Sequence, residues 1–259
     1  MPIPIYQVDA FSARVFGGNP AAVCPLESWL PDDVLQSIAA ENNLAETAYF
    51  VKTGDRYQIR WFTPTVEVDL CGHATLASAF VILTRLTPDK TEVHFHSKSG
   101  ELAVAREGDR FSLDFPSRPP EKCTAPPGLL AALGGEPALV MAARDYLVVY
   151  DSEDEIADLS PDMGLIAGLD RFAVIVTAPG RNSDFVSRFF APAKGVPEDP
   201  VTGSSHCTLT PYWAKRLGKS HLHAFQISPR RGELWCEDRG ARVKITGHAV
   251  CFLEGTILL

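Results

Sequence analysis

Two passages of this chain repeat each other, and this repeat constrains the fold more than any other feature. The first begins with RWFTP at residues 60–64 and continues into VEVDLCGHATL, while the second begins with RFFAP at residues 188–192 and continues to TGSSHCTL. The arginines lie 128 residues apart and the later glycines, Gly72 and Gly203, lie 131 apart, so only three residues are inserted. Each passage has the pattern of a strand, a proline turn, an acidic connection and an uncharged helix. We therefore predict two homologous halves, each with a strand that leads into a buried central helix.

The segments around these passages supply strands for two domains. Residues 1–116 form the predicted N-terminal half, with one amphipathic helix at 31–43 that has a proline start and apolar spacing of three and four. Clustered prolines predict a linker over 116–122. Residues 117–247 form the C-terminal half, and the last strand, 248–259, is expected to join the first half.

Two helices of the second half carry separate expectations. One is expected near residues 154–168, and the central helix is expected to begin at Gly203. Pro211 falls about eight residues into that central helix and should kink or end it, because proline lacks an N–H group and clashes with the preceding turn. The two halves are therefore not expected to be equivalent.

Composition restricts the class of protein. The 259 residues are 46% hydrophobic and 22% charged, as in ordinary globular proteins. A net charge of −8 argues against nucleic acid or an anionic membrane as the partner. The longest uncharged apolar stretch, residues 70–83, is too short to span a bilayer, and the N-terminus lacks the pattern of a targeting signal. We expect a cytoplasmic protein.

Cofactor and metal motifs are missing from the sequence. The six cysteines are scattered without a CxxC pair, which favours a reducing compartment and gives no zinc-ligand spacing. GGNP at residues 17–20 has neither the GxGxxG nor the GK[ST] context of a phosphate-binding loop. We expect no metal and no cofactor.

The N-termini of the two central helices are the first candidate site. A buried helix N-terminus presents unpaired N–H groups and partial positive charge, and a carboxylate can satisfy both. Cys71 and His73 lie at the first of these positions, where the dipole is expected to lower the pKa of the thiol. A direct thiol–imidazole pair is not expected, because residues two apart on a helix point in different directions. A two-thiol racemase is disfavoured, since Thr202 occupies the position of Cys71 and Cys207 lies deeper, and Cys71 could also be a small packed residue.

Five segments together resemble the PhzF family of phenazine-biosynthesis-like proteins, within the diaminopimelate-epimerase-like fold. They are VDAFSARVFGGNPAAV (8–23), NNLAETAYF (42–50), FTPTVEVDLCGHAT (62–75), FFAP (189–192) and EDPVTGSSH (198–206). The CGHAT segment alone also resembles proline racemases and hydroxyproline dehydratases. The resemblance implies an α+β fold of two pseudo-symmetric domains. Each is a curved, mostly antiparallel, barrel-like sheet around a central helix, with the active site between the domains.

The same resemblance implies a function for particular residues. The best-known members isomerise a dihydro-hydroxyanthranilate without metal or organic cofactor, and a glutamate moves a proton between carbons. That glutamate corresponds to Glu46, and further functional positions correspond to His73, Asp199 and Ser204. Backbone amides near both helix starts would hold the substrate carboxylate. The implied substrate-binding set is Gly72, His73, Gly203, Ser204 and Cys71.

We therefore expect a cofactor-free isomerase that acts on a small, cyclic or conjugated carboxylate and forms a homodimer, with no nucleic-acid or membrane partner. A partly desolvated carboxyl group can serve first as base and then as acid near neutral pH. Two alternatives stay open: a lyase that uses the same base and then loses hydroxide, and a binding protein without turnover. The named residues also have structural interpretations, as a capping Glu46, a core His73, a turn-forming Asp199 and a helix-capping Ser204.

Overall fold

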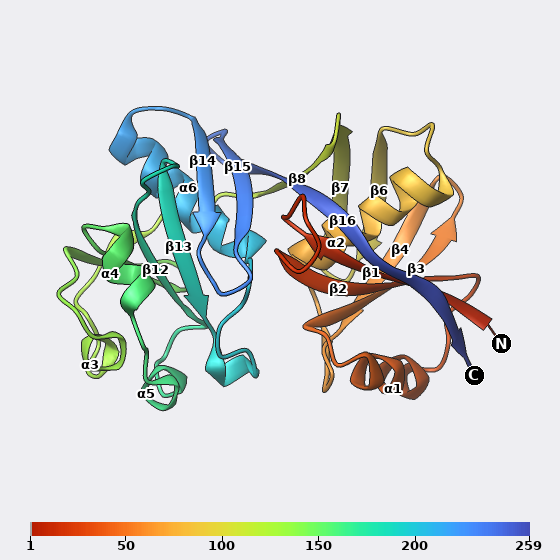
Figure 1. The fold of residues 1–259 in the computed structure, drawn as a ribbon, viewed down its shortest axis with the longest axis horizontal. Coiled ribbons are helices and arrows are strands. Elements are labelled where there is room, and N and C mark those ends of the chain that lie inside the picture. The colour runs from red at the N-terminus through yellow and green to blue at the C-terminus, as the bar shows by residue number, and fades with distance from the viewer. Residues whose placement is uncertain (1) are drawn as a thin grey trace. The chain divides into compact units, whose positions relative to one another are not determined.

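The computed structural model describes residues 2–259, which form two compact units (Figure 1). The first unit comprises residues 2–114 together with Thr246–Leu259, and the second comprises Phe115–Ile245. Among the described residues, no helix is both long and apolar enough to cross a membrane.

The first unit is a closed sheet. Its strand order is β1–β2–β3–β4–β6–β7–β8–β16, and the antiparallel pairing of β16 with β1 returns this order to its start. Closure leaves the long strands of the ring without a free edge. The strands are β1 (Pro2–Ala10), β2 (Asn19–Leu26), β3 (Glu46–Thr53), β4 (Arg56–Phe62), β5 (Glu67–Val68), which pairs with β4 alone, β6 (Glu92–Ser97), β7 (Gly100–Glu107), β8 (Arg110–Pro116) and β16 (Arg242–Leu258), which also runs through the end of the second unit.

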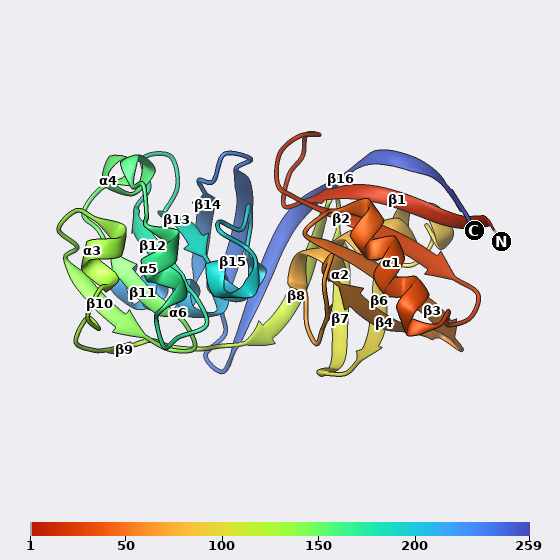
Figure 2. The ribbon, with the colours of Figure 1, turned by 90° about the horizontal axis from the view of Figure 1, so that it is seen from below.

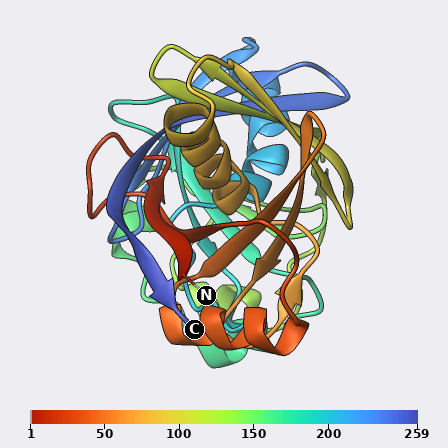
Figure 3. The same ribbon diagram turned by 90° about the vertical axis from the view of Figure 1, so that its right-hand side faces the viewer.

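The centre of this ring is filled by α2 (Gly72–Val81), which continues as one π-helical turn, η1 (Ile82–Leu86) (Figure 3). The helix packs against β1, β2, β3 and β7, and nearly all of its side chains are buried. Its sequence, GHATLASAFV, is rich in small residues that let surrounding strands approach. The hydroxyl groups of Thr75 and Ser78 tolerate burial because they donate to the carbonyls of Cys71 and Ala74, four residues back.

The helix α1 (Asp32–Asn42) lies on the outside of the same sheet (Figure 2). Its Leu35 and Ile38 pack against apolar side chains of the strands, including Tyr49 and Phe62. The helix ends where Asn43 takes a left-handed conformation with φ of 49°, which asparagine tolerates better than most residues. The amphipathic helix predicted at 31–43 is therefore confirmed, one residue shorter at each end.

The second unit is a sheet with helices on both faces. The strand order is β15–β14–β13–β12–β11–β10–β9. One face carries α6 (Gly203–Leu217), whose Trp213 stacks on Phe185, and the other face carries α3 (Leu129–Leu133), α4 (Glu153–Asp158) and α5 (Met163–Ala167). The strands are β9 (Glu121–Lys122), β10 (Leu139–Ala142), β11 (Tyr146–Val149), β12 (Val174–Pro179), β13 (Phe185–Phe190), β14 (His221–Gln226) and β15 (Gly232–Asp238).

Two expectations for the second unit need correction. The single helix expected near 154–168 is two short helices, because Asp162 accepts a hydrogen bond from Leu165 N and begins a new helix after Pro161. The linker expected at 116–122 is only four residues, 117–120, since β8 includes Pro116 and residues 121–122 form β9.

Pro211 does not end α6, which continues to Leu217. Proline at this position removes the N–H that would bond to the carbonyl of Cys207, four residues earlier. That carbonyl instead accepts a hydrogen bond from the backbone N–H of Arg118, at 2.9 Å. A partner from a distant part of the same unit thus satisfies the group that proline leaves free.

Gly18, in the turn before β2, lies close to the backbone of Ala10, and a comparison with Gly54 tests this close approach. Gly18 and Gly54 both have positive φ. A Cβ atom on Gly18 would lie 2.1 Å from the carbonyl oxygen of Ala10, whereas a Cβ atom on Gly54 would have no atom within 4 Å. We expect Gly54→Ala to lower the free energy of unfolding by about 1–2 kcal/mol. Gly18→Ala should cost about 1–3 kcal/mol more, because backbone atoms must move. Urea unfolding of both variants measures the difference, and equal losses would contradict the close approach.

Candidate active site

Glu46 is placed by the connection between α1 and β3. It is the first residue of β3 and lies opposite Ala21 of the neighbouring parallel strand β2. After the left-handed Asn43 reverses the chain, the side-chain amide of Asn42 donates to the hydroxyl of Thr47, at 3.1 Å, and ties the end of the helix to the strand. Glu46 therefore sits at a fixed strand end, with 16% of its side chain exposed.

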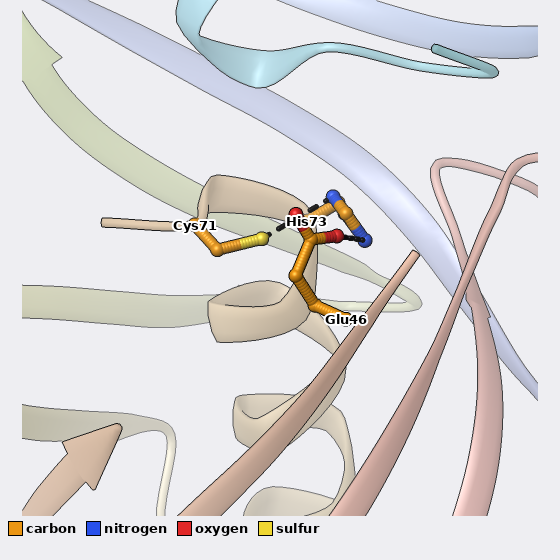
Figure 4. Close-up of side chains that lie close together, drawn as sticks. All are labelled: Glu46, Cys71 and His73. Atoms are coloured by element: carbon orange, nitrogen blue, oxygen red, sulfur yellow. Dashed lines mark hydrogen bonds and ion pairs between the residues drawn. The ribbon is translucent and has the colours of Figure 1, made fainter. Parts of the chain in front are cut away.

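Cys71 and His73 reach the same point from the start of α2 (Figure 4). The sulfur of Cys71 lies 3.5 Å from His73 Nδ1, and His73 Nε2 lies 3.1 Å from Oε2 of Glu46. The expectation of no direct thiol–imidazole pair is wrong, because Cys71 is not helical. It is the N-cap, with extended φ of −140° and ψ of 110°, so the argument from helical directions does not apply to it.

The charge state of this cluster follows from burial and proximity. Burial disfavours a charge on His73, but Cys71 and Glu46 outweigh it and raise its pKa well above the ordinary value of 6.5. Nε2 of His73 and Oε2 of Glu46 form a close ion pair rather than an aligned hydrogen bond, since neither buried atom has a hydrogen-bond partner. Because Cys71 favours the charged ring only as a thiolate, Glu46 is the neighbour that favours an imidazolium at His73 near neutral pH.

The expectation that the helix dipole lowers the pKa of Cys71 is also wrong. Burial, followed by the negative charge of Glu46, raises the pKa of this thiol to about 11, and His73 offsets only part of that rise. The partial charge at a helix end acts within one turn and contributes little against full desolvation. Cys71 is therefore a neutral thiol at physiological pH.

Asn19 is a member of the cluster that the sequence did not single out. Its side-chain Nδ2 lies 3.2 Å from His73 Nδ1. A half-turn of the amide would present its oxygen to an imidazolium instead. In the sequence Asn19 lies inside GGNP, which reads as an ordinary turn, although residues 8–23 as a whole resemble the PhzF family.

The second group of expected residues lies at the start of α6 in the second unit. Gly203 and Ser204 form the first turn, Gly203 buried and Ser204 half-buried. The carboxylate of Asp199 accepts a short hydrogen bond from the hydroxyl of Thr202. Gln226, which the sequence did not indicate, accepts from Thr202 N at 2.8 Å and donates to the carbonyl of Asp199 at 2.7 Å. A glutamine on a distant strand thus holds this helix start in place.

The two helix starts share a local design. Cys71 and Thr202 are both extended N-cap residues without a side-chain capping bond. In each case, the carbonyl of the N-cap receives a bond from a side chain four residues later, Thr75 Oγ1 in one helix and His206 Nδ1 in the other. Burial lowers the pKa of His206 to about 4, although its bond to Thr202 acts in the opposite direction. His206 is thus neutral, whereas His73 is charged.

An arginine on the preceding strand fixes each connection. Arg60 makes two bonds, of 2.7 and 2.9 Å, to the carboxylate of Glu67, and Arg188 makes two, of 2.8 and 3.0 Å, to that of Glu198. Each guanidinium also lies over the phenylalanine two residues later in its own strand. The repeated RWF and RFF patterns therefore supply a planar clamp on the loop that leads to each helix.

The first cluster also has the spacing of a metal site. One ligand atom from each of Glu46, Cys71 and His73 lies within 4.8 Å of the others. Cysteine spacing, from which we expected no metal, cannot reveal a site made of one thiol, a histidine two residues later and a carboxylate from another strand.

Comparison with known proteins assigns the family. A family model described as phenazine biosynthesis-like protein, PhzC-PhzF, matches residues 8–255. The chain belongs to this family. An uncharacterized isomerase of Pseudomonas aeruginosa is 54% identical over 259 residues, with full coverage of both chains. The crystal structure of a PhzF-family protein from Enterococcus faecalis superposes with a TM-score of 0.98 at 48% identity, again over the whole of both chains.

More distant structures share the fold alone. A hydroxyproline epimerase from Agrobacterium vitis has a TM-score of 0.60 at 10% identity, with 100% of this chain and 93% of that chain covered. The PhzF assignment and the epimerase-like α+β fold implied by the sequence motifs are thus confirmed.

The two buried histidines give a direct test of the electrostatics. At pH 7 in metal-free protein, we expect the His73 ring to be doubly protonated and the His206 ring to be neutral, because their pKa values move in opposite directions. Nitrogen-15 NMR of the imidazoles, assigned with His73→Gln and His206→Gln, distinguishes these states. Two neutral rings would contradict the ion pair with Glu46.

The same shift predicts a pH dependence of stability. The folded pKa of His73 is above its unfolded value of about 6.5, so its stabilising contribution is complete below that pH. It is lost as pH rises through the folded pKa. The difference in unfolding free energy between the parent chain and His73→Gln should therefore shrink steadily above pH 6.5 in urea titrations.

The arginine clamp can be tested by a conservative substitution. Arg60→Lys keeps the charge but loses the two parallel bonds to the largely buried Glu67, and we expect a loss of about 1–3 kcal/mol in unfolding free energy. The control is Arg56→Lys, whose partner Glu101 is half-exposed, and which should change stability by less than about 0.5 kcal/mol. Similar effects of the two changes in urea unfolding would argue against the clamp.

Proposed function

We propose that the protein is a cofactor-independent isomerase that moves a proton between two carbons of a small carboxylate, with Glu46 as the proton carrier. The observation that carries this proposal is the position of Glu46. Its carboxylate is mostly buried and lies 3.1 Å from His73 at the uncapped N-terminus of α2. Membership of a family with relatives named as isomerases supports the reaction class.

The proton transfer can proceed with one carboxyl group. The Glu46 carboxylate takes a proton from an activated carbon of the substrate, and the electron pair of the broken C–H bond spreads into the conjugated system. The resulting carboxylic acid then returns the proton to a second carbon on the same face, which regenerates the carboxylate. No atoms are gained or lost, and the double bond shifts position.

His73 has a supporting role in this proposal. Its Nε2 atom lies 3.1 Å from Oε2 of Glu46 and can hold the carboxylate in position towards the substrate. A carboxylate is a weak base towards carbon, so the substrate carbon must be acidified by conjugation. The proposal is therefore restricted to conjugated or otherwise activated carboxylates.

Substrate binding is assigned to the helix starts. The amides of Gly72 and His73 belong to the first turn of α2, where backbone N–H groups have no partner within the helix. We propose that they bind the substrate carboxylate, with Cys71 as a neutral packing neighbour. By family resemblance, Gly203 and Ser204 also take part in substrate binding, and Asp199 in catalysis. The homodimer stays a prediction.

The proposal can be tested by proton NMR in heavy water. The protein is mixed with amino and hydroxy carboxylates, including a dihydro-hydroxyanthranilate, and deuterium incorporation is followed. We expect exchange at one carbon and a decrease of at least about 100-fold in Glu46→Gln. The control is Glu41→Gln, an exposed residue of α1, which should exchange at the parent rate.

The other outcomes separate the alternatives. Exchange that survives Glu46→Gln would place the base elsewhere. Loss of hydroxide from the substrate would identify a lyase that uses the same base. Ligand binding without exchange in the parent chain would favour a binding protein.

A further inference from the structure

The cluster of Glu46, Cys71 and His73 has a second chemical capacity that proton transfer does not use. It brings together one carboxylate oxygen, one sulfur and one ring nitrogen. We propose that these three residues bind a thiophilic divalent cation of the Zn²⁺ type. Binding of the cation does not depend on the isomerase proposal and can be tested without a substrate.

The geometry of the cluster suits a tetrahedral ion. Bond lengths of about 2.3 Å for Zn–S and about 2.0 Å for Zn–N, at a tetrahedral angle, separate sulfur from nitrogen by about 3.5 Å. The sulfur of Cys71 lies 3.5 Å from Nδ1 of His73. This pair thus already has the required separation. The carboxylate of Glu46, which lies beside Nε2, has to turn towards the ion, and the amide of Asn19 has to move away from Nδ1.

Two polar atoms of the cluster support a ligand in this place. Oε2 of Glu46 and Nε2 of His73 are buried and face each other at 3.1 Å as an ion pair, but neither has an aligned hydrogen-bond partner. Buried polar groups are normally satisfied, so unsatisfied ones indicate a ligand or a functional role. Partial exposure of Glu46 leaves a route for the ion from solvent.

The donor set selects for the class of cation. One thiolate, one imidazole and one carboxylate are the ligands that Zn²⁺ takes in proteins, whereas Mg²⁺ and Ca²⁺ prefer oxygen ligands alone. The ion replaces the proton on the thiol of Cys71 and one proton on the ring of His73, both of which pass to solvent. The thiolate and the carboxylate then balance its two positive charges. The partial positive charge at the N-terminus of α2 repels a cation, but the negative charges of the thiolate and the carboxylate lie closer to the ion.

Occupation of this site would inhibit the isomerase. A carboxylate oxygen bound to the ion cannot accept a proton from a carbon, so Zn²⁺ would compete with proton transfer at Glu46. This consequence rests on the proposed function. Failure of the isomerase assay would leave the binding result unaffected, because the two are measured separately.

The test uses Co²⁺ as a spectroscopic probe and Zn²⁺ in calorimetry, with chelator-treated protein. We expect one Zn²⁺ per chain, and a sulfur-to-cobalt charge-transfer band in the near ultraviolet with Co²⁺. Cys71→Ser should abolish the band and weaken Zn²⁺ binding at least tenfold. Glu46→Gln should keep the band and weaken binding. The control is Cys123→Ser, a half-buried thiol of the second unit, which should behave as the parent chain.

Several results would overturn the proposal. These are the absence of a charge-transfer band in the parent chain, a band that persists in Cys71→Ser, or a band that is lost in Cys123→Ser. Circular dichroism of each variant shows whether it is folded. If Cys71→Ser fails to fold, competition of Zn²⁺ with an alkylating reagent at Cys71 in the parent chain replaces it: protection by Zn²⁺ supports the site, and unchanged labelling refutes it.

Discussion

The start of α2 is buried and has no side-chain cap, and the arrangement of Glu46, His73 and Asn19 depends on this helix start. Cys71 supplies an extended backbone and a thiol, but no capping bond to the first amides of the helix. The first N–H groups of a helix have no partner within the helix, and anionic groups bind favourably at such positions. The strand end that carries Glu46 and the turn that carries Asn19 both meet this helix start, so a carboxylate, an amide and the His73 ring converge on one point.

Rigidity of the connections is what makes that convergence possible. Arg60 and Arg188 hold the loops before the two central helices through planar, two-bond pairs with Glu67 and Glu198. A lysine in either place would provide the charge but not the fork. The same strand therefore gives both a core phenylalanine and the clamp that fixes the adjacent helix start. This explains why the arginine and the phenylalanine are repeated together in both halves.

The two halves share the same local backbone arrangement but differ in the charge of the histidine at the helix start. Thr75 and His206 occupy corresponding positions and bond to the N-cap carbonyl of their helix. His206 stays neutral because nothing charged offsets its burial, whereas His73 pairs with a carboxylate and a thiol. Divergence of a few side chains on a common frame has thus placed the charged histidine in the first unit, beside Glu46 and Cys71.

The sequence by itself determined the repeat, the two uncharged central helices, the amphipathic α1 and the family, because these depend on local periodicity and on motifs a few residues long. It also singled out Glu46 and His73, although their roles remain proposals. Only the tertiary structure decided the contact of Cys71 with His73 and the raised pKa of that thiol, since both depend on burial and on a backbone that is extended one residue before the helix. The tertiary structure also explains why α6 continues beyond Pro211, because the N–H of Arg118, from a remote segment, bonds to the carbonyl of Cys207 that proline leaves free. Partners that are far apart in the chain leave no local pattern, and so the sequence could not show them.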